Sequence, residues 1–430
     1  MFGPSRILLL LSAVACAESP SVSLPPERIV LIVVDTLRRD HVGVYGAERA
    51  TPHIDSLAED GTVFTDAVAS FHSTPTSMGA LFTGRTPSLE SGRSGRALPW
   101  NQHSWCGLAR FARDARDACV PASLPTLAER LRELGYWTVG IHSHPLLRSP
   151  TGFQRGFQHW RELRGASPHM AFGRRNQPVF AAARAAEHVN EAVFAALDAR
   201  RSDRFFLYVH YLDVHDWHLA GVPYADAVAR ADRAVGELLD GLERRGLRLG
   251  SVIVLTSDHG ESLGEQHFQT PRARHAGNPS FETVLRVPLV VGGLALDGSE
   301  RLTRSEDVFR LIVALAGGEA PPSELAPGEQ LVTENRDRLY RQGRWKSFWP
   351  RGPGPARLVD LVADPEERHD VAAEHPDVLA AHAERVETLS ARLAAQAPVP
   401  EEVDPQQREH LRALGYLEPA YDLDAPAEAP

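Results

Sequence analysis

Continuous runs of aliphatic and aromatic residues alternate along the chain with stretches whose apolar residues recur at helical spacing. Residues 29–34, 205–212 and 251–256 form such runs, and an unbroken run is typical of a strand buried on both faces of a parallel sheet. Residues 225–244 carry the longest amphipathic pattern and are followed by Gly246, which predicts a long helix that ends at a glycine. Strands that alternate with helices predict an α/β fold with an open, mostly parallel sheet.

The last third of the chain adds a smaller, separate pattern. Proline and glycine cluster at residues 320–328, which predicts a linker, and residues 339–348 predict a hairpin with Gly343 at its turn. The other predicted elements are helices at residues 77–83, 124–134 and 377–396 and strands at residues 136–141 and 287–291. The predicted organisation is an export signal at residues 1–17, a main domain at 26–320, a small subdomain at 325–397 and a tail at 398–430.

The N-terminus has the layout of an export signal. Arg6 precedes the apolar residues 7–11, and small residues follow up to Cys16, a run too short to span a bilayer as a stable helix. A cysteine in this place resembles the bacterial lipoprotein box, which predicts a lipid anchor at Cys16 as the one contact with a membrane. Cleavage after Ala15 or Ala17 would instead leave a secreted chain. Both alternatives place the mature protein in the periplasm or cell envelope.

Composition narrows the classes of partner. The chain has 430 residues, 43% of them hydrophobic, and a formal net charge of −10. A folded core is therefore expected, and a nucleic-acid partner is not, because no dense basic block offsets the acidic excess. Three cysteines are too few for a disulfide-built scaffold. Cys106 and Cys119 predict either a disulfide in an oxidising compartment or two separate buried thiols.

Acidic residues and a histidine directly follow two of the predicted strands. Asp35 follows the strand at residues 29–34, and Asp258 and His259 follow the strand at residues 251–256. The carboxyl ends of parallel strands meet at one edge of a sheet, so these side chains are expected to lie together. Carboxylate oxygens and an imidazole nitrogen suit a divalent ion with open coordination positions. A single Asp after a strand, by contrast, is more often a turn residue or a helix cap.

A third segment, residues 71–85, is rich in hydroxyl groups and leads into the helix predicted at residues 77–83. Unpaired N–H groups and the positive end of the helix dipole would hold an anionic centre that a hydroxyl attacks there. The simpler interpretation of the same residues is a Ser/Thr helix cap.

Together these motifs resemble those of the sulfatase family, within the alkaline-phosphatase superfamily, from about residue 29 to residue 415. The matching segments include Val-Asp-Thr-Leu-Arg at 34–38, Leu-Phe-Thr-Gly-Arg at 81–85, Gly-Phe-Gln-Arg-Gly-Phe at 152–157, Thr-Ser-Asp-His-Gly-Glu at 256–261 and Arg-Val-Pro at 286–288. The resemblance implies a large, mostly parallel mixed sheet between helices with a small C-terminal α+β subdomain. It also implies the activity of a sulfatase-like ester hydrolase.

The resemblance further implies a metal site. The family's ligands carry over to Asp35, Asp258 and His259, the last in place of the commoner Asn. Thr36 stands where many members have a second Asp, so that ligand is weaker or absent here. The implied cofactor is a divalent ion, namely Ca²⁺, Mn²⁺, Zn²⁺ or Mg²⁺.

The nucleophile motif departs from the family pattern, which is Cys/Ser-x-Pro-x-Arg with the first residue oxidised to formylglycine. Ser73 fits this pattern together with Pro75, except that Ser77 replaces the Arg. Counting back from Thr83 instead places Thr74 at the nucleophile, and Thr cannot become formylglycine. Helix length fixes geometry more rigidly than a turn does, which favours Thr74 and phosphoryl or phosphonate chemistry. Ser73 remains the alternative.

Imidazole and ammonium groups are expected around the transferred group, because negative charge develops on its equatorial oxygens. The residues predicted to neutralise that charge or to protonate the leaving group are His144, His215, His275 and Lys346. His72 and His210, each beside apolar residues, are expected to be structural.

These observations predict a metal-dependent hydrolase that cleaves a sulfate, phosphate or phosphonate ester of a small molecule or glycan through a hydroxyl-type nucleophile. This chain lacks the Arg of the family's nucleophile motif, and it also lacks the Lys of the Lys-x-His motif of many members, because residues 141–145 read Ile-His-Ser-His-Pro. These losses leave one alternative, a non-catalytic envelope protein that binds an anionic glycan or another partner. The other alternative is a transferase of a phospho-substituent, although such enzymes usually carry transmembrane helices, which this sequence does not show.

Overall fold

The computed structural model describes most of the chain. The described residues are 25–87, 120, 124–147, 149, 151–163, 185–218, 220–268, 281–320, 323, 325–333 and 337–394. The predicted export signal with Cys16, the pair Cys106 and Cys119, the candidate His275 and the predicted tail lie outside these residues. None of the helices in the described part of the chain combines the length and the apolar character that crossing a membrane requires.

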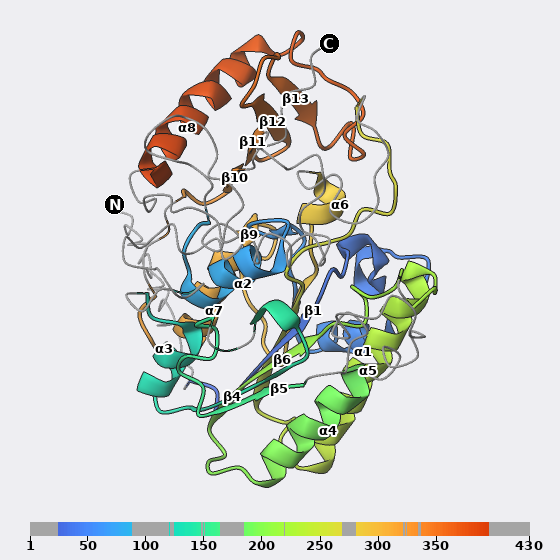
Figure 1. Cartoon of the computed structure of the whole chain (residues 1–430), viewed down its shortest axis with the longest axis vertical. Helices are drawn as coiled ribbons and strands as arrows, with labels where there is room; N and C mark the ends of the chain where they lie inside the picture. The colour runs from blue at the N-terminus through green and yellow to red at the C-terminus, as the bar shows by residue number, and fades with distance from the viewer. Residues whose placement is uncertain are drawn as a thin grey trace, which may run out of the picture.

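A seven-stranded sheet with the strand order β2-β8-β7-β1-β6-β4-β5 forms the centre of the main domain (Figure 1). Its strands are β1 (Arg28–Val34), β2 (Thr62–Val63), β4 (Trp137–His142), β5 (His159–Glu162), β6 (Phe205–Tyr211), β7 (Ser251–Thr256) and β8 (Leu289–Gly292). Strands β7, β1, β6, β4 and β5 run parallel, and β8 runs antiparallel to β7. The mostly parallel mixed sheet expected from the sequence is therefore confirmed, and β1 has a parallel neighbour on each side.

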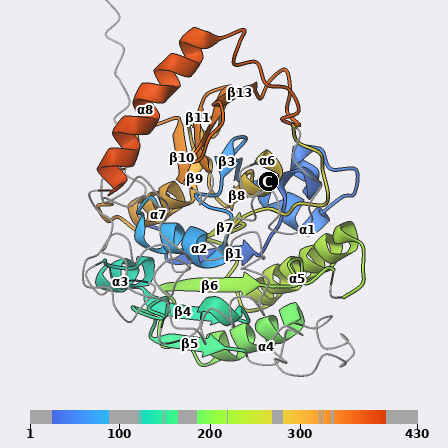
Figure 2. The same ribbon diagram turned by 45° about the horizontal axis from the view of Figure 1, so that its top comes forward.

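Helices cover both faces of this sheet (Figure 2). On one face lie α4 (Ala185–Asp198) and α5 (Tyr224–Arg244), and on the other lie α2 (Thr74–Thr83), α3 (Leu127–Glu133) and α7 (Ser305–Leu315). Alternate residues of β1 belong to two separate hydrophobic cores, one on each face, and residues 29–34 are all fully buried. Burial on both faces explains why this sequence run is unbroken rather than alternating.

The small subdomain combines an antiparallel sheet with one long helix. Its elements are β10 (Glu329–Thr333), β11 (Asp337–Gln342), β12 (Trp345–Pro350), β13 (Arg357–Asp360) and α8 (Pro376–Ala394). Strands β11 and β12 pair in antiparallel register, and Gly343 has a φ of +58° at the turn between them. The predicted hairpin is therefore confirmed, whereas the two strands that flank it, β10 and β13, were not predicted.

Two helices begin at residues other than those predicted from the sequence. Helix α2 begins at Thr74 rather than at residue 77, and α3 begins at Leu127 rather than at residue 124. Thr126 and Glu129 form a capping box that explains the start of α3, because each side chain accepts a hydrogen bond from the other residue's backbone N–H. The short elements are η1 (Arg39–His41), η2 (Gly43–Tyr45), α1 (Pro52–Asp55), η3 (Ser56–Ala58), β3 (Ala67–Val68), η5 (Pro145–Leu147), α6 (Glu282–Leu285) and β9 (Thr303–Arg304).

Two glycines at helix C-termini test how tightly α2 packs. Gly84 and Gly135 have φ values of +67° and +85°. A Cβ at Gly84 would lie 2.6 Å from Cδ1 of Phe309 in α7, whereas a Cβ at Gly135 would meet nothing within 4 Å. We expect Gly135→Ala to lower the free energy of unfolding by about 1–2 kcal/mol, the cost of a left-handed backbone for alanine. Gly84→Ala should lower it by about 2–5 kcal/mol, because overpacking against Phe309 adds to that strain.

Equilibrium denaturation of the two variants measures this difference. If the two variants lose equal free energy of unfolding, α2 and α7 accommodate the added methyl group without overpacking.

Candidate active site

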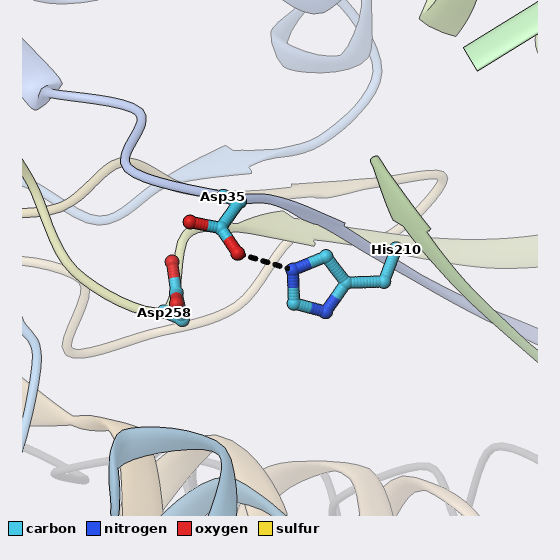
Figure 3. Close-up of side chains that lie close together, drawn as sticks. All are labelled: Asp35, His210 and Asp258. Atoms are coloured by element: carbon cyan, nitrogen blue, oxygen red, sulfur yellow. Dashed lines mark hydrogen bonds and ion pairs between the residues drawn. The ribbon is translucent and has the colours of Figure 1, made fainter. Parts of the chain in front are cut away.

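The ends of three adjacent strands place Asp35, His210 and Asp258 together at one edge of the main sheet (Figure 3). Asp35 directly follows β1, His210 lies in β6, and Asp258 lies just beyond the end of β7. One potential ligand atom from each residue lies within 4.8 Å of the others. We call these three residues the strand-end triad. The expectation that the two aspartates meet at this edge is confirmed.

Both carboxylates of the triad are buried, and each keeps one oxygen that accepts no hydrogen bond from a described residue. Asp35 Oδ2 lies 3.1 Å from His210 Nε2, and its Oδ1 is the unpaired atom. Asp258 Oδ1 accepts hydrogen bonds from the backbone N–H groups of Thr36 (3.1 Å) and His259 (2.9 Å), and its Oδ2 is the unpaired atom. Two buried carboxylates are costly without a cation, so this donor set fits a divalent metal ion.

The surroundings keep Asp258 ionised. Burial alone raises the pKa of Asp258, but the neighbouring imidazoles of His259 and His210, with the Thr74 hydroxyl and the Thr36 N–H, outweigh burial and hold that pKa below its ordinary value. The carboxylate form, which is the form that binds a cation, is therefore favoured.

The backbone of Thr36 is unusual and connects the two carboxylates. Its φ is +55°, a left-handed conformation that is strained for a β-branched residue. This conformation directs its N–H to Asp258 Oδ1, while its hydroxyl donates to the backbone oxygen of Asp35 at 2.8 Å. The Tyr224 hydroxyl donates to the backbone oxygen of Thr36 at 2.6 Å. Thr36, a predicted metal candidate, thus reaches Asp258 through its backbone, and its hydroxyl bonds to the main chain.

Helix α2 directs its N-terminus toward the triad. Ser73 is the N-cap residue and Thr74 is the first residue of the helix. Thr74 Oγ1 lies 3.4 Å from His259 Nε2, whereas the Ser73 hydroxyl donates to Thr76 Oγ1 at 3.1 Å. Of the two predicted nucleophiles, Thr74 is therefore the one that faces a predicted metal ligand.

Comparison with known proteins identifies the family of the chain. Residues 27–317 match the family model described as Sulfatase. The chain belongs to the sulfatase family. Steryl-sulfatase of Rattus norvegicus is 25% identical, with 94% of this chain and 95% of the relative covered. N-acetylgalactosamine-6-O-sulfatase of Bacteroides thetaiotaomicron is 22% identical, with 90% of this chain and 99% of the relative covered.

Solved structures share the fold. A putative sulfatase from Bacteroides thetaiotaomicron superposes with a TM-score of 0.66 at 18% identity, over 89% of this chain and 96% of the other. The phosphonate monoester hydrolase of Agrobacterium radiobacter superposes with a TM-score of 0.60 at 17% identity, over 88% of this chain and 100% of the other. The predicted fold is confirmed, and the chain is a sulfatase-like ester hydrolase, as the sequence implied.

Two further histidines near the strand-end triad differ in charge. The Leu146 N–H donates to His144 Nδ1 at 3.1 Å, so Nε2 carries the proton and lies 3.3 Å from Asp35 Oδ2. Burial, and then the neighbouring imidazoles, lower the pKa of His144 well below its ordinary value. Burial also lowers the pKa of His215, but its hydrogen bond to Asp216 and the charge of Asp35 outweigh burial and raise that pKa to about 9. At neutral pH, His144 is a neutral donor and His215 is a cation.

His210 was expected to be structural, and the structure places it in the strand-end triad. It is fully buried, as expected, and its Nδ1 lies 2.7 Å from the Tyr208 hydroxyl. The strand register explains its position, because β1 and β6 pair in parallel with Val33 opposite His210. His72, the other histidine expected to be structural, stacks on Phe71 with ring centroids 4.4 Å apart.

Lys346 belongs to a buried ion network in the small subdomain. It lies in β12 and is fully buried, with Nζ 2.9 Å from Glu282 Oε1 and 2.6 Å from Glu367 Oε1. Among the described residues, its ion pairs run to these two carboxylates and to neither aspartate of the triad. The structure therefore does not bring Lys346 to the site, and its predicted role in neutralising the substrate stays a prediction.

Arg38 was not among the candidate site residues. Its guanidinium forms hydrogen bonds to two segments beside the site. Its guanidinium binds both carboxylate oxygens of Asp40, at 2.9 and 2.6 Å, the backbone oxygen of Glu261 at 3.2 Å and the carboxylate of Glu265. It thus connects the segment that follows β1 with the segment that follows His259.

Replacement of Lys346 separates a structural role from a catalytic one. Lys346→Met leaves Glu367 buried without its cation and removes one of the cations of Glu282, which keeps Arg341 at 3.3 Å. We therefore expect the free energy of unfolding to fall by about 3–5 kcal/mol. Adding Glu367→Gln should recover part of this loss, because the unpaired charge is removed. Chemical denaturation measures both effects, and kcat is measured where the variant remains folded.

Arg344→Met is the matched control for this experiment. It removes the exposed pair with Asp360 and should change stability little. A large fall in kcat in folded Lys346→Met would contradict the structural role and place the ammonium at the substrate.

Proposed function

We propose that the protein is a metal-dependent hydrolase that cleaves a phosphate, phosphonate or sulfate ester through the Thr74 hydroxyl. The observation that carries this proposal is the position of that hydroxyl, at the N-terminus of α2 and 3.4 Å from His259 Nε2. His259 directly follows Asp258 of the strand-end triad, so the hydroxyl lies beside the donor set that fits a cation. The N–H groups at the start of a helix attract an anionic group, as the substrate would require.

Asp35, Asp258, His259 and His210 would hold the divalent ion. Such an ion lowers the pKa of an adjacent hydroxyl and neutralises negative charge on the substrate. The unpaired oxygens of Asp35 and Asp258 support this assignment, because buried carboxylate oxygens otherwise find hydrogen-bond donors.

Two other polar groups of the site would protonate the leaving group and hold Asp35 in place. The Thr74 hydroxyl gives its proton to water, its oxygen attacks phosphorus or sulfur and forms a new ester bond, and the bond to the leaving-group oxygen breaks. His215, as a cation, gives that oxygen its proton. His215 recovers a proton from that water, and a second water molecule hydrolyses the ester on Thr74 and restores its hydroxyl. His144 donates its N–H to Asp35 and so keeps that carboxylate in place.

The identity of the nucleophile favours phosphorus over sulfur. Thr74 cannot become formylglycine, and Ser73, which could, donates its hydroxyl to Thr76. The phosphonate monoester hydrolase among the proteins of this fold supports a phosphorus ester as substrate. The relatives named steryl-sulfatase and N-acetylgalactosamine-6-O-sulfatase support the alternative, a small-molecule or glycan sulfate cleaved through Ser73.

We also propose that the chain works outside the cytoplasm, in the periplasm or cell envelope. The export-type pattern of residues 1–17 supports this location, and Cys16 is the candidate lipid anchor. A non-catalytic role in binding an anionic glycan needs neither a nucleophile nor a bound metal ion, so the variants described next distinguish it from hydrolysis.

Substitutions at the two hydroxyls identify the nucleophile. Thr74→Ala should lower kcat/KM toward aryl phosphate, phosphonate and sulfate esters about a thousandfold or more, equivalent to about 4 kcal/mol. Thr74→Ser keeps a hydroxyl and should retain activity. Ser73→Ala, the matched control, should stay within about tenfold of the unsubstituted enzyme. The reverse order, together with a formylglycine detected at Ser73 by peptide mass spectrometry, would establish the alternative register.

Removal of a triad carboxylate tests the metal site. Asp258→Asn should abolish both turnover and bound divalent metal, because the amide cannot supply the negative charge that the ion requires. Asp226→Asn, on helix α5, is the control and should change neither. Elemental analysis after dialysis and steady-state kinetics measure the two effects. Unsubstituted protein that holds no stoichiometric metal and cleaves none of the esters would support the non-catalytic role instead.

A further inference from the structure

The tautomer of His259 is determined by its backbone contact. Its Nδ1 lies 2.8 Å from the backbone oxygen of Gly260. A carbonyl oxygen accepts hydrogen bonds and cannot donate them, so Nδ1 carries the proton. In the neutral ring, Nε2 is then left with a lone pair.

That lone pair faces the carboxylate of Asp258, and the Thr74 hydroxyl can donate a hydrogen bond to it. His259 Nε2 lies 3.4 Å from Asp258 Oδ2 and 3.4 Å from Thr74 Oγ1. Asp258 Oδ2 accepts no hydrogen bond from any residue in the described ranges. A carboxylate oxygen opposite an imidazole lone pair, both in a buried site, is repulsive unless a cation lies between them. Asp258 Oδ2 and His259 Nε2 therefore have the character of metal-ligand atoms.

His210 has a similar second contact. Its Nδ1 lies 2.7 Å from the Tyr208 hydroxyl, and its Nε2 lies 3.1 Å from Asp35 Oδ2. When Nδ1 donates to the hydroxyl oxygen, Nε2 presents its lone pair to the triad. Histidine ligands commonly donate the other ring N–H to a fixed acceptor in this way, which orients the ring.

His144 provides the contrast. The Leu146 N–H donates to its Nδ1, so its Nε2 carries the proton and donates to Asp35. His144 is thus a positioning residue for Asp35, whereas His259 and His210 are oriented as nitrogen ligands.

We propose that the metal site selects a borderline ion such as Zn²⁺ over Ca²⁺ or Mg²⁺, with His259 and His210 as nitrogen ligands and Asp35 and Asp258 as oxygen ligands. This inference rests on the metal site of the proposed function. Ca²⁺ takes six to eight oxygens and Mg²⁺ six, and the triad with His259 offers two carboxylates in a buried setting. Two imidazoles and two carboxylates match the coordination number and the donor types that Zn²⁺ prefers.

Metal binding to the full chain tests this inference without reference to turnover. Protein freed of metal by a chelator is dialysed against Zn²⁺, Ca²⁺ or Mg²⁺, and bound ion and thermal unfolding are measured. We expect stoichiometric Zn²⁺ with a raised unfolding temperature, and Ca²⁺ and Mg²⁺ bound at least about a hundredfold more weakly, a difference of about 2.7 kcal/mol.

A substitution then tests the nitrogen ligand. His259→Asn replaces the nitrogen with an amide oxygen and should lower the preference for Zn²⁺ over Ca²⁺ at least about tenfold. His53→Asn makes the same change at an exposed histidine and should leave the preference unaltered. If His259→Asn fails to fold, the preference of the unsubstituted protein for Zn²⁺ over Ca²⁺ and Mg²⁺ still tests the inference.

The outcomes separate this inference from the proposed function. Stoichiometric Ca²⁺ that supports ester hydrolysis and outcompetes Zn²⁺ would overturn the inference and leave the proposed function intact. If folded His259→Asn keeps the same preference for Zn²⁺ over Ca²⁺, His259 is not the ligand that selects the ion. That result would also overturn the inference. Absence of any bound divalent ion would overturn both.

Discussion

The structure around the site depends on one electrostatic constraint, the burial of Asp35 and Asp258 within 4.8 Å of each other. Two carboxylates repel strongly where water cannot screen them. The protein supplies part of the compensation itself, through the Thr36 N–H to Asp258 and the His144 N–H to Asp35. The strained φ of Thr36 persists because it makes the first of these contacts. One oxygen of each carboxylate accepts no hydrogen bond from a described residue, and the divalent cation of the proposed function would account for both.

The position of β1 in the sheet creates this constraint. Its parallel neighbours β6 and β7 end at the same edge, in a register that sets Val33 beside both His210 and Thr256. Three segments distant in sequence therefore meet where their strands end, which is where open α/β sheets bind ligands. Helix α2 packs on one face of the same sheet and brings Thr74 to this edge. The Ser77 hydroxyl fixes that position, because it donates to the backbone oxygen of Asp258 at 2.5 Å.

Some of this could be predicted from sequence and some could not, for physical reasons. Strands buried on both faces have unbroken apolar runs, so β1, β6 and β7 were recognisable, and the residues that follow them could be assigned to one edge. His210 could not be placed, because strand order and register depend on tertiary packing and not on local pattern. Lys346 has partners at Glu282 and Glu367. These partners are far away in sequence, so the resemblance alone could not reveal its buried ion pairs.

Two of the departures from the sulfatase pattern, Thr74 at the nucleophile and His259 in place of the commoner Asn, are physically coupled in the proposed site. A formylglycine hydrate already carries an activated hydroxyl, whereas a threonine hydroxyl must lose its proton against a much higher pKa. An ion held by nitrogen ligands in the manner of Zn²⁺ lowers the pKa of a bound oxygen strongly. Thr74 Oγ1 and His259 Nε2 lie 3.4 Å apart, so the altered nucleophile adjoins the altered ligand. A chain with Thr74 and an oxygen-only metal site would lack that activation, and one with His259 and formylglycine would not need it.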